Sequence, residues 1–184
     1  MRKVLVILLV GLVVFAGVAS AEELKFRGVE FGSTIDQVKQ AEDTSLIDSS
    51  SDALVYKDTL ASKEFIILYE FQNDSFESAM YYFAQDYVSN PNTYTDTYYN
   101  IKSTLKDKYG APDTTSETWI SNPTFTDDMG WAVKTGEVGL ADGWEFDNGS
   151  IKMTLGNISG EVLFGIIYES DSVKDESTST ESKL

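Results

Sequence analysis

The sequence predicts an α+β fold in which helices pack on one face of an antiparallel sheet. Apolar residues recur every three or four positions over residues 94–109, and this spacing predicts an amphipathic helix. Apolar side chains alternate over 65–71 and again over 76–82, which predicts two strands of a meander. A short motif also occurs twice in the chain, and this repetition indicates two similar units.

The first half of the chain carries signals for one short helix and several strands. Residues 24–29 predict a short strand, after which Ser33 or Thr34 can cap the start of a helix. Residues 43–52 are rich in Ser and Asp, a composition that indicates a loop. The strands expected after this loop are 53–57, 65–71 and 76–82.

The second half begins with the helix over 94–109, which is expected to end at Gly110 because Pro112 prevents its continuation. Residues 121–142 are expected to form a long irregular segment, and loops of this length in compact domains are often functional. The strands expected around this segment are 115–120, 143–147, 150–155 and 161–169.

The repeated motif favours a tandem arrangement. Residues 69–76 are Tyr-Glu-Phe-Gln-Asn-Asp-Ser-Phe, and residues 144–151, which lie 75 positions later, are Trp-Glu-Phe-Asp-Asn-Gly-Ser-Ile. We expect two units, over about 24–88 and 89–169, each with one helix and three or four strands. The alternative is that two hairpins converge on the same letters, because tight turns favour Asn, Asp and Gly.

Both ends of the chain are expected to lie outside a single folded domain over 22–169. Residues 1–21 combine two basic residues, an apolar run and small residues before the end, which is typical of a signal peptide cleaved after Ala21. The alternative is an uncleaved anchor, although the apolar run of 16 residues is shorter than the roughly 20 that a membrane helix needs. Residues 170–184 are polar and are predicted to be a disordered tail.

The composition excludes several kinds of chemistry and partner. The 184 residues contain no Cys and no His, so disulfides, Ser-His-Asp and Cys-His catalytic pairs and zinc sites of these ligands are excluded. A formal net charge of −16 argues against nucleic acid and anionic membrane surfaces as partners. Small secreted eukaryotic domains usually rely on disulfides, so we expect bacterial export, to the periplasm or the medium. No stable membrane insertion is expected after signal cleavage.

Two segments resemble small exported bacterial proteins of unknown function. Residues 26–33 with 36–39 are similar to their opening "F-x-G-I-x-W/F-G-S … E-x-V-K", and residues 105–112 with Trp119 are similar to "L-x-x-K-Y-G-x-P … W". Those proteins resemble the tandem helix-plus-sheet fold of the β-lactamase-inhibitor-protein group and of the small outer-membrane assembly lipoproteins. The resemblance implies this fold and an envelope location, and it implies no reaction. The chain lacks the lipid-bearing Cys and the disulfides of these relatives.

Carboxylates are the only abundant candidates for catalytic groups. In or beside the 121–142 segment these are Asp127, Asp128, Asp142, Glu145 and Asp147. An opposed pair could hydrolyse a glycan, and Asp127, Asp128 and Asp147 could bind Ca²⁺. No complete calcium-loop motif is present, and solvated charges are common in a chain with 30 acidic residues. We therefore expect no catalytic residue and no required cofactor.

Aromatic residues are the second excess and suggest a contact surface. The candidates for binding-surface residues are Tyr81, Tyr87, Tyr99, Trp131 and, on the first hairpin turn, Asp74. In the inhibitor proteins that the chain resembles, an acidic hairpin residue enters an enzyme's active site, which raises enzyme inhibition as one alternative. The structural alternative is that a sheet with few helices needs large side chains to cover its faces.

The sequence therefore predicts an exported, non-catalytic binding module of the bacterial cell envelope. It is expected to contact a protein or an envelope component through an aromatic-rich sheet surface or through the 121–142 loop. A carboxylate-based glycan hydrolase and an inhibitor of a secreted enzyme are the alternatives.

Overall fold

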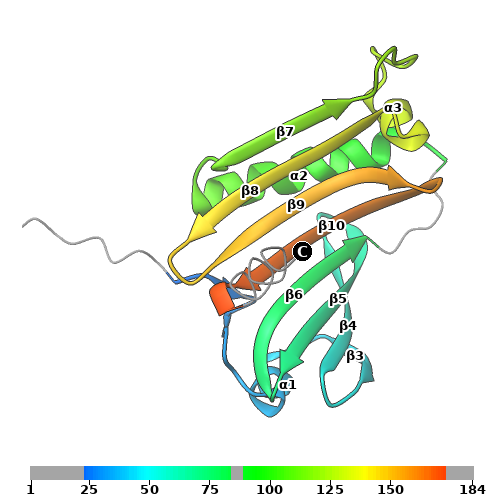
Figure 1. Cartoon of the computed structure of the whole chain (residues 1–184). Coiled ribbons are helices and arrows are strands. Elements are labelled where there is room, and N and C mark those ends of the chain that lie inside the picture. Colours follow the sequence, from blue (N-terminus) through cyan, green and yellow to red (C-terminus); the bar gives the residue numbers. More distant parts are fainter. Residues whose placement is uncertain (1–22, 84–88, 173–184) are drawn as a thin grey trace, which may run out of the picture.

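The structure of the chain is a computed structural model that describes residues 23–83 and 89–172 (Figure 1). In chain order the elements are β1 (Lys25–Phe26), β2 (Val29–Glu30), α1 (Ile35–Ala41), β3 (Ser45–Ser49), β4 (Ala53–Leu60), β5 (Lys63–Gln72), β6 (Ser75–Phe83), α2 (Asn92–Tyr109), β7 (Thr114–Trp119), α3 (Met129–Thr135), β8 (Val138–Phe146), β9 (Gly149–Ile158) and β10 (Glu161–Ser170). The predicted signal peptide over 1–21, the candidate Tyr87 and most of the predicted tail lie outside the described residues.

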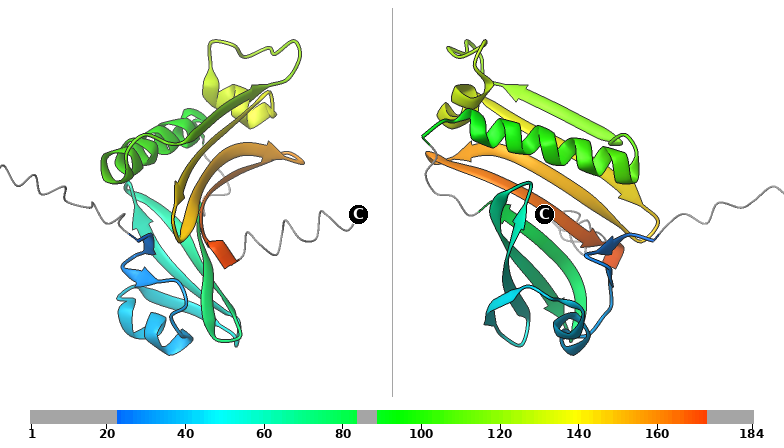
Figure 2. Two further views of the ribbon diagram at one scale, coloured as in Figure 1. Left: turned by 60° about the vertical axis from the view of Figure 1, so that its left-hand side comes forward. Right: turned by 180° about the vertical axis from the view of Figure 1, so that it is seen from behind.

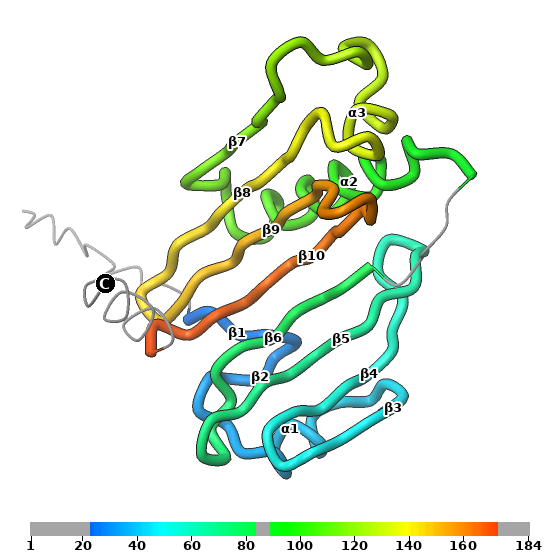
Figure 3. Tube along the Cα trace, turned by 45° about the vertical axis from the view of Figure 1, so that its right-hand side comes forward, coloured from blue at the N-terminus to red at the C-terminus, as the bar shows by residue number. Residues whose placement is uncertain are grey.

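Eight strands form one antiparallel sheet in the order β3-β4-β5-β6-β10-β9-β8-β7 (Figure 3). Strands β6 and β10 pair in the middle, from Ser78 opposite Glu169 to Tyr82 opposite Gly165. This pairing joins the two series β3–β6 and β7–β10 into a continuous sheet. The predicted class, helices combined with an antiparallel sheet, is confirmed.

One face of the sheet, which we call the covered face, packs against the helices and holds the core. Seen from behind, α2 lies in front of β7 to β10 (Figure 2). Phe65 of β5 and Phe164 of β10 are buried on this face, and their ring centroids lie 5.9 Å apart. Phe164 also lies 5.8 Å from the ring of Tyr98 on α2. Through these aromatic contacts, a single hydrophobic core continues on both sides of the β6–β10 pairing.

Helix α1 has the capped start that the sequence predicts. Thr34 accepts a hydrogen bond from the backbone N–H of Gln37, and the Gln37 side chain accepts one from the backbone N–H of Thr34, which makes a capping box. Asp74, in the turn between β5 and β6, accepts a hydrogen bond from the backbone N–H of Ile35 at 3.0 Å. The start of α1 is therefore fixed to the β5–β6 turn.

Helix α2 follows the apolar stripe that the sequence predicts. Its buried apolar residues are Tyr94, Tyr98, Ile101 and Leu105. The ring of Tyr109, in the last turn, packs edge-to-face on Phe146 at 5.3 Å. Gly110 ends the helix with a φ of 89°, a conformation that glycine adopts without strain.

Two segments that the sequence assigns to loops contain regular elements, so these two predictions are wrong. Residues 45–49, inside the predicted loop 43–52, form the edge strand β3, in which every residue is exposed. Pairing with β4 rather than burial makes this segment a strand, so its polar composition conceals it. Residues 121–142 contain α3 and half of β8. Asp128 caps the start of α3, and Gly136, with a φ of 77°, ends it.

The repeated motif forms two hairpins that differ in place and geometry. Residues 69–76 span the β5–β6 turn, and residues 144–151 span the β8–β9 turn. Asn73 and Asp74 both have positive φ, of 53° and 64°, whereas neither residue of the second turn does. Counted from α1 and from α2, the first hairpin joins the third and fourth strands, and the second joins the second and third. The shared letters therefore reflect turn chemistry at non-equivalent positions.

Candidate binding surface

We call the face of the sheet opposite α1, α2 and α3 the open face (Figure 2). Each strand sends alternate residues to the two faces. On β5 the buried residues of the covered face are Phe65, Ile67, Tyr69 and Phe71. The residues between them belong to the open face and are Glu64, Ile66, Leu68 and Glu70.

Apolar side chains from four neighbouring strands gather near the middle of the open face. Val55 pairs with Leu68, and Leu68 pairs with Met80. Met80 in turn pairs with Ile167. Together with the adjacent pair of Ile66 and Tyr82, these residues form what we call the apolar band: Val55, Ile66, Leu68, Met80, Tyr82 and Ile167. All of them are partly exposed, and a contiguous exposed apolar patch often marks an interaction site.

A row of glutamates borders the apolar band two residues further along the strands. Glu70 pairs with Ser78, and Ser78 pairs with Glu169. Glu169 pairs with Ser150, and Ser150 pairs with Glu145. We call Glu70, Glu145 and Glu169 the acidic row. Glu70 on β5 and Glu169 on β10 therefore lie beside the apolar band, and Glu145 continues the row two strands further, on β8.

Two lysines on the open face are held by carboxylates of the same face. Lys152 Nζ lies 2.6 Å from Glu169 Oε2, and Lys57 Nζ lies 2.7 Å from Glu64 Oε2. These pairs are partly exposed, so each contributes little to stability, about 0–1 kcal/mol. Because both lysines are paired, the part of the open face that the structure describes presents no basic patch.

The candidate carboxylate Asp142 is a structural residue on the covered face. Its side chain is buried and accepts hydrogen bonds from Tyr98 of α2 and Thr115 of β7, both at 2.6 Å. Lys102 Nζ lies 2.7 Å from Asp142 Oδ1. Burial alone would raise the pKa of Asp142, but the hydrogen bonds from Lys102, Thr115 and Tyr98 hold it below its usual range. Burial and the bond to Asp142 raise the pKa of Tyr98.

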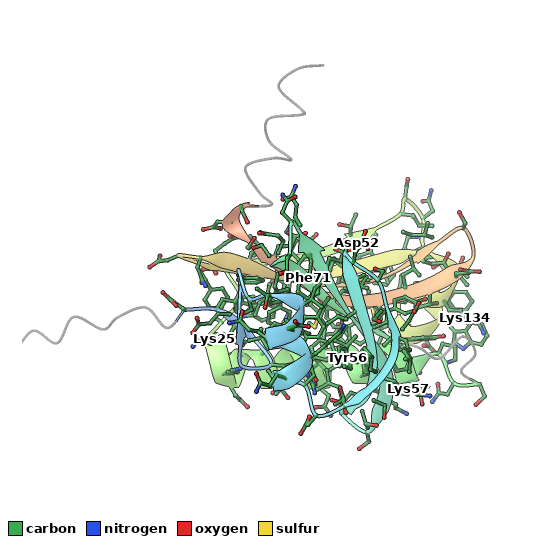
Figure 4. All side chains as sticks on the ribbon, turned by 90° about the horizontal axis from the view of Figure 1, so that it is seen from below. Lys25, Asp52, Tyr56, Lys57, Phe71 and Lys134 are labelled. Atoms are coloured by element: carbon green, nitrogen blue, oxygen red, sulfur yellow. The ribbon has the colours of Figure 1, made fainter. Side chains whose placement is uncertain are left out.

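The structure does not bring the other candidate carboxylates together. Asp128 accepts a hydrogen bond from the backbone N–H of Trp131 and caps α3. Asp147 lies in the β8–β9 turn, next to Asn148, whose side chain bonds the backbone of Leu24. Lys25 follows Leu24 in the chain, and Lys134 lies on α3. Viewed from below, these two lysines lie at opposite sides of the molecule (Figure 4), so the β8–β9 turn with Asp147 is far from the start of α3 with Asp128. Within the described ranges, no cluster of three or more acidic residues is placed to hold a metal ion.

The candidate aromatic residues that the structure describes, Tyr81, Tyr99 and Trp131, lie away from the open face. Tyr81 is on the covered face, where its ring packs against Phe26 at 5.0 Å, because alternation along β6 places it with the buried Phe83. Tyr99 on α2 is 45% exposed, and Trp131 on α3 is 40% exposed. Tyr82 is the one aromatic residue of the apolar band, which therefore differs from the aromatic-rich sheet surface that the sequence suggests.

Tyr99 borders a small pocket beside Asp142. The pocket has a volume of about 60 Å³ and is lined by residues of α2, β7 and β8. Typical ligand pockets measure about 300–1,000 Å³, so this one does not fit a glycan. The geometry around Asp142 supports a structural role and no hydrolytic one.

Two charged groups that the sequence does not single out, one buried and one partly buried, have structural roles. Glu137 is buried and accepts hydrogen bonds from the backbone N–H groups of Thr124 and Phe125, at 2.6 and 2.8 Å, so it holds the segment before α3 in place. Arg27 lies 2.7 Å from both Glu42 and Asp58 and ties the β1–β2 turn to the sheet. Nothing in the local sequence separates these residues from solvated charges.

Comparison of the chain with protein-family models, with curated proteins and with solved structures gives no match. Among the helices of the described ranges, none has the length and apolar character needed to span a membrane.

Proposed function

We propose that this protein is an exported, non-catalytic binding module of the bacterial cell envelope, and that it contacts a protein partner through the open face. The observation that carries this proposal is the apolar band, which four strands present on the face opposite α1, α2 and α3. Burying a partly exposed aliphatic side chain in an interface gains about 25 cal/mol per Å² of apolar surface, which the folded chain does not obtain by itself.

The chemistry of the carboxylates supports binding over catalysis. Asp142 is engaged with Tyr98, Thr115 and Lys102, and Asp128 caps a helix. Asp74 holds the start of α1, which gives this residue a structural reason to be in the hairpin turn. The hydrolase and inhibitor alternatives therefore have less support than contact through the sheet.

We also propose that the folded part consists of two tandem units, over about 24–88 and 89–169. The strand order supports this, because the series that follows α1 and the series that follows α2 meet at their last strands, β6 and β10. The repeated motif gives no support, since its two copies lie at non-equivalent hairpins. An experimental structure in which β3–β6 superpose on β7–β10 strand for strand agrees with tandem units, and failure to superpose contradicts them.

Export is proposed from the residues before Glu22. N-terminal sequencing of the protein recovered outside the cytoplasm is expected to begin at Glu22. Recovery of the exported protein with an intact Met1 would contradict cleavage and favour an anchor.

The binding proposal is tested by capture of envelope proteins with three forms of the bait. The first is the unaltered chain, the second carries L68T and M80T in the apolar band, and the third carries I120T, outside the band but 50% exposed. Threonine is compatible with strands, so the band variant is expected to fold. A partner held by the first and third baits but lost with the second supports the proposal.

The same experiment can overturn the proposal. Circular dichroism and thermal unfolding establish that all three baits are folded. A captured protein that is retained by the L68T/M80T bait, or an empty capture with folded baits, is the contradictory result.

A further inference from the structure

We infer that the partner presents a basic amphipathic helix to the open face, with its apolar stripe on the apolar band and its Lys and Arg residues over the acidic row. This inference rests on the proposed function and names the chemistry of the partner. It follows from the charge of the chain, the place of the carboxylates and the dimensions of the band.

Charge complementarity selects a basic partner. The chain carries a net charge of −16, so a second copy of it, or an anionic membrane, is repelled over a large part of the surface. Lys57 and Lys152 on the open face are each paired with a glutamate. Among the described residues of this face a basic segment meets no unpaired lysine, and it gains the attraction of Glu70 beside the band and of Glu169, which it shares with Lys152.

The position of the acidic row fits a segment that is apolar on one side and basic beside it. Leu68 and Glu70 are two residues apart on β5, as are Ile167 and Glu169 on β10, and both pairs face the same side. Two residues along a strand span about 7 Å. A helix with its side chains is about 10–12 Å across, so a Lys or Arg flanking its apolar stripe reaches the row while the stripe contacts the band.

The length of the band suits about three helical turns. The band crosses β4, β5, β6 and β10, and three gaps of about 4.8 Å between neighbouring strands give about 14 Å. A helix rises about 1.5 Å per residue, so about 10 residues cover this distance. Such a helix offers apolar anchors at positions i, i+4 and i+7, which is a common way for a helix to occupy an apolar surface.

Two synthetic helical peptides probe this surface directly. Both carry leucine at the anchor positions, and the flanking positions hold lysine in one peptide and glutamate in the other. Fluorescence polarisation measures their binding to the purified chain, at peptide concentrations up to about 100 µM, which detects affinities in the micromolar range. We expect the lysine peptide to bind at least tenfold more tightly than the glutamate peptide, and we expect its affinity to fall as salt is raised.

Paired charge variants separate the effect of the open face on peptide binding from the effect of the net charge of the whole protein. E70Q/E169Q removes two charges from the acidic row and also frees Lys152 on the open face, whereas D96N/D107N removes two charges from exposed positions on α2, behind the sheet. We expect E70Q/E169Q to weaken the lysine peptide about fivefold and D96N/D107N to leave it within twofold. We expect L68T/M80T to abolish binding of the lysine peptide.

Each other outcome overturns the inference in a recognisable way. Equal weakening by both charge variants means unspecific attraction to an acidic protein. If the two peptides bind equally and both lose binding to L68T/M80T, the inference of a basic partner is wrong, but the proposal of binding through the open face is still supported. Failure of both peptides to bind overturns the helical partner, whereas the proposed function fails only if the capture experiment also fails.

Discussion

The two faces of the sheet are built from the same strands and differ in what they contain. On β5, the covered face carries aromatic and aliphatic residues that are almost completely buried, and the open face carries Ile66 and Leu68 between Glu64 and Glu70. The covered face finds its partners within the chain, in α1, α2 and α3. Burial within the fold therefore accounts for the covered face of β5, whereas the apolar residues on the open face of this strand stay partly exposed.

The largest effect expected from this comparison is on stability. Phe65 is fully buried and its ring contacts Phe83 and Phe164, so F65A is expected to lower the free energy of unfolding by about 3–5 kcal/mol. L68A, on the open face of the same strand, is expected to cost less than about 1.5 kcal/mol because its side chain is already partly exposed. Urea denaturation measures the free energy of unfolding of both variants. Similar losses of stability in F65A and L68A would contradict the difference between the two faces.

The buried carboxylate of the covered face gives the next largest effect. D142A removes the partner of Lys102, Tyr98 and Thr115, so it is expected to destabilise the chain by about 3 kcal/mol. E145A, on the same strand but exposed, serves as the matched control and is expected to change stability by about 0.5 kcal/mol or less. Loss of equal size in both variants would argue against the role assigned to Asp142.

The Asp142 carboxyl group also makes the stability of the fold depend on pH. The folded pKa of Asp142 lies below its unfolded value of about 3.9, so the charged form stabilises the fold above that pH. As the pH falls below about 3.9 toward the folded pKa, protonation removes this contribution. The stability difference between the unaltered chain and D142N is therefore expected to be constant above about pH 5 and to shrink at lower pH. A difference that grows on acidification would contradict the shift.

Much of the difference between the covered face and the open face could be predicted from the sequence. The stripe that begins with Tyr94 and Tyr98 fixes the position and buried side of α2, because a helical period over many residues has few alternatives. Alternation over 65–71 predicts β5 and its buried face. The sequence also shows Ile66 and Leu68 on the second face of this strand, which is the signal that points to the apolar band.

Other features depend on contacts that the local sequence does not encode. Strand β3 is exposed at every residue, so no apolar pattern marks it, and only its pairing with β4 defines it. Asp142 and Glu137 have the same residue types as the solvated acids of the chain and differ from them only through distant partners. The motif at 69–76 and 144–151 misleads because turn chemistry repeats even where strand positions do not correspond.

A smaller stability effect than those of F65A and D142A is expected at the hairpin that holds α1. D74A removes the acceptor for the Ile35 N–H and places alanine at a φ of 64°, so a loss of about 1–2 kcal/mol is expected. D74N keeps both the acceptor oxygen and a residue that tolerates this conformation, and it is expected to be nearly neutral. Thermal unfolding of the two variants checks this, and equal losses would show that the acceptor is not what matters.

The most direct test of the account measures binding and stability on the same variant. L68T/M80T is expected to retain the folded state, with an unfolding free energy within about 2 kcal/mol of the unaltered chain, while it loses the envelope partner. Retention of the partner by this folded variant would contradict the assignment of binding to the open face.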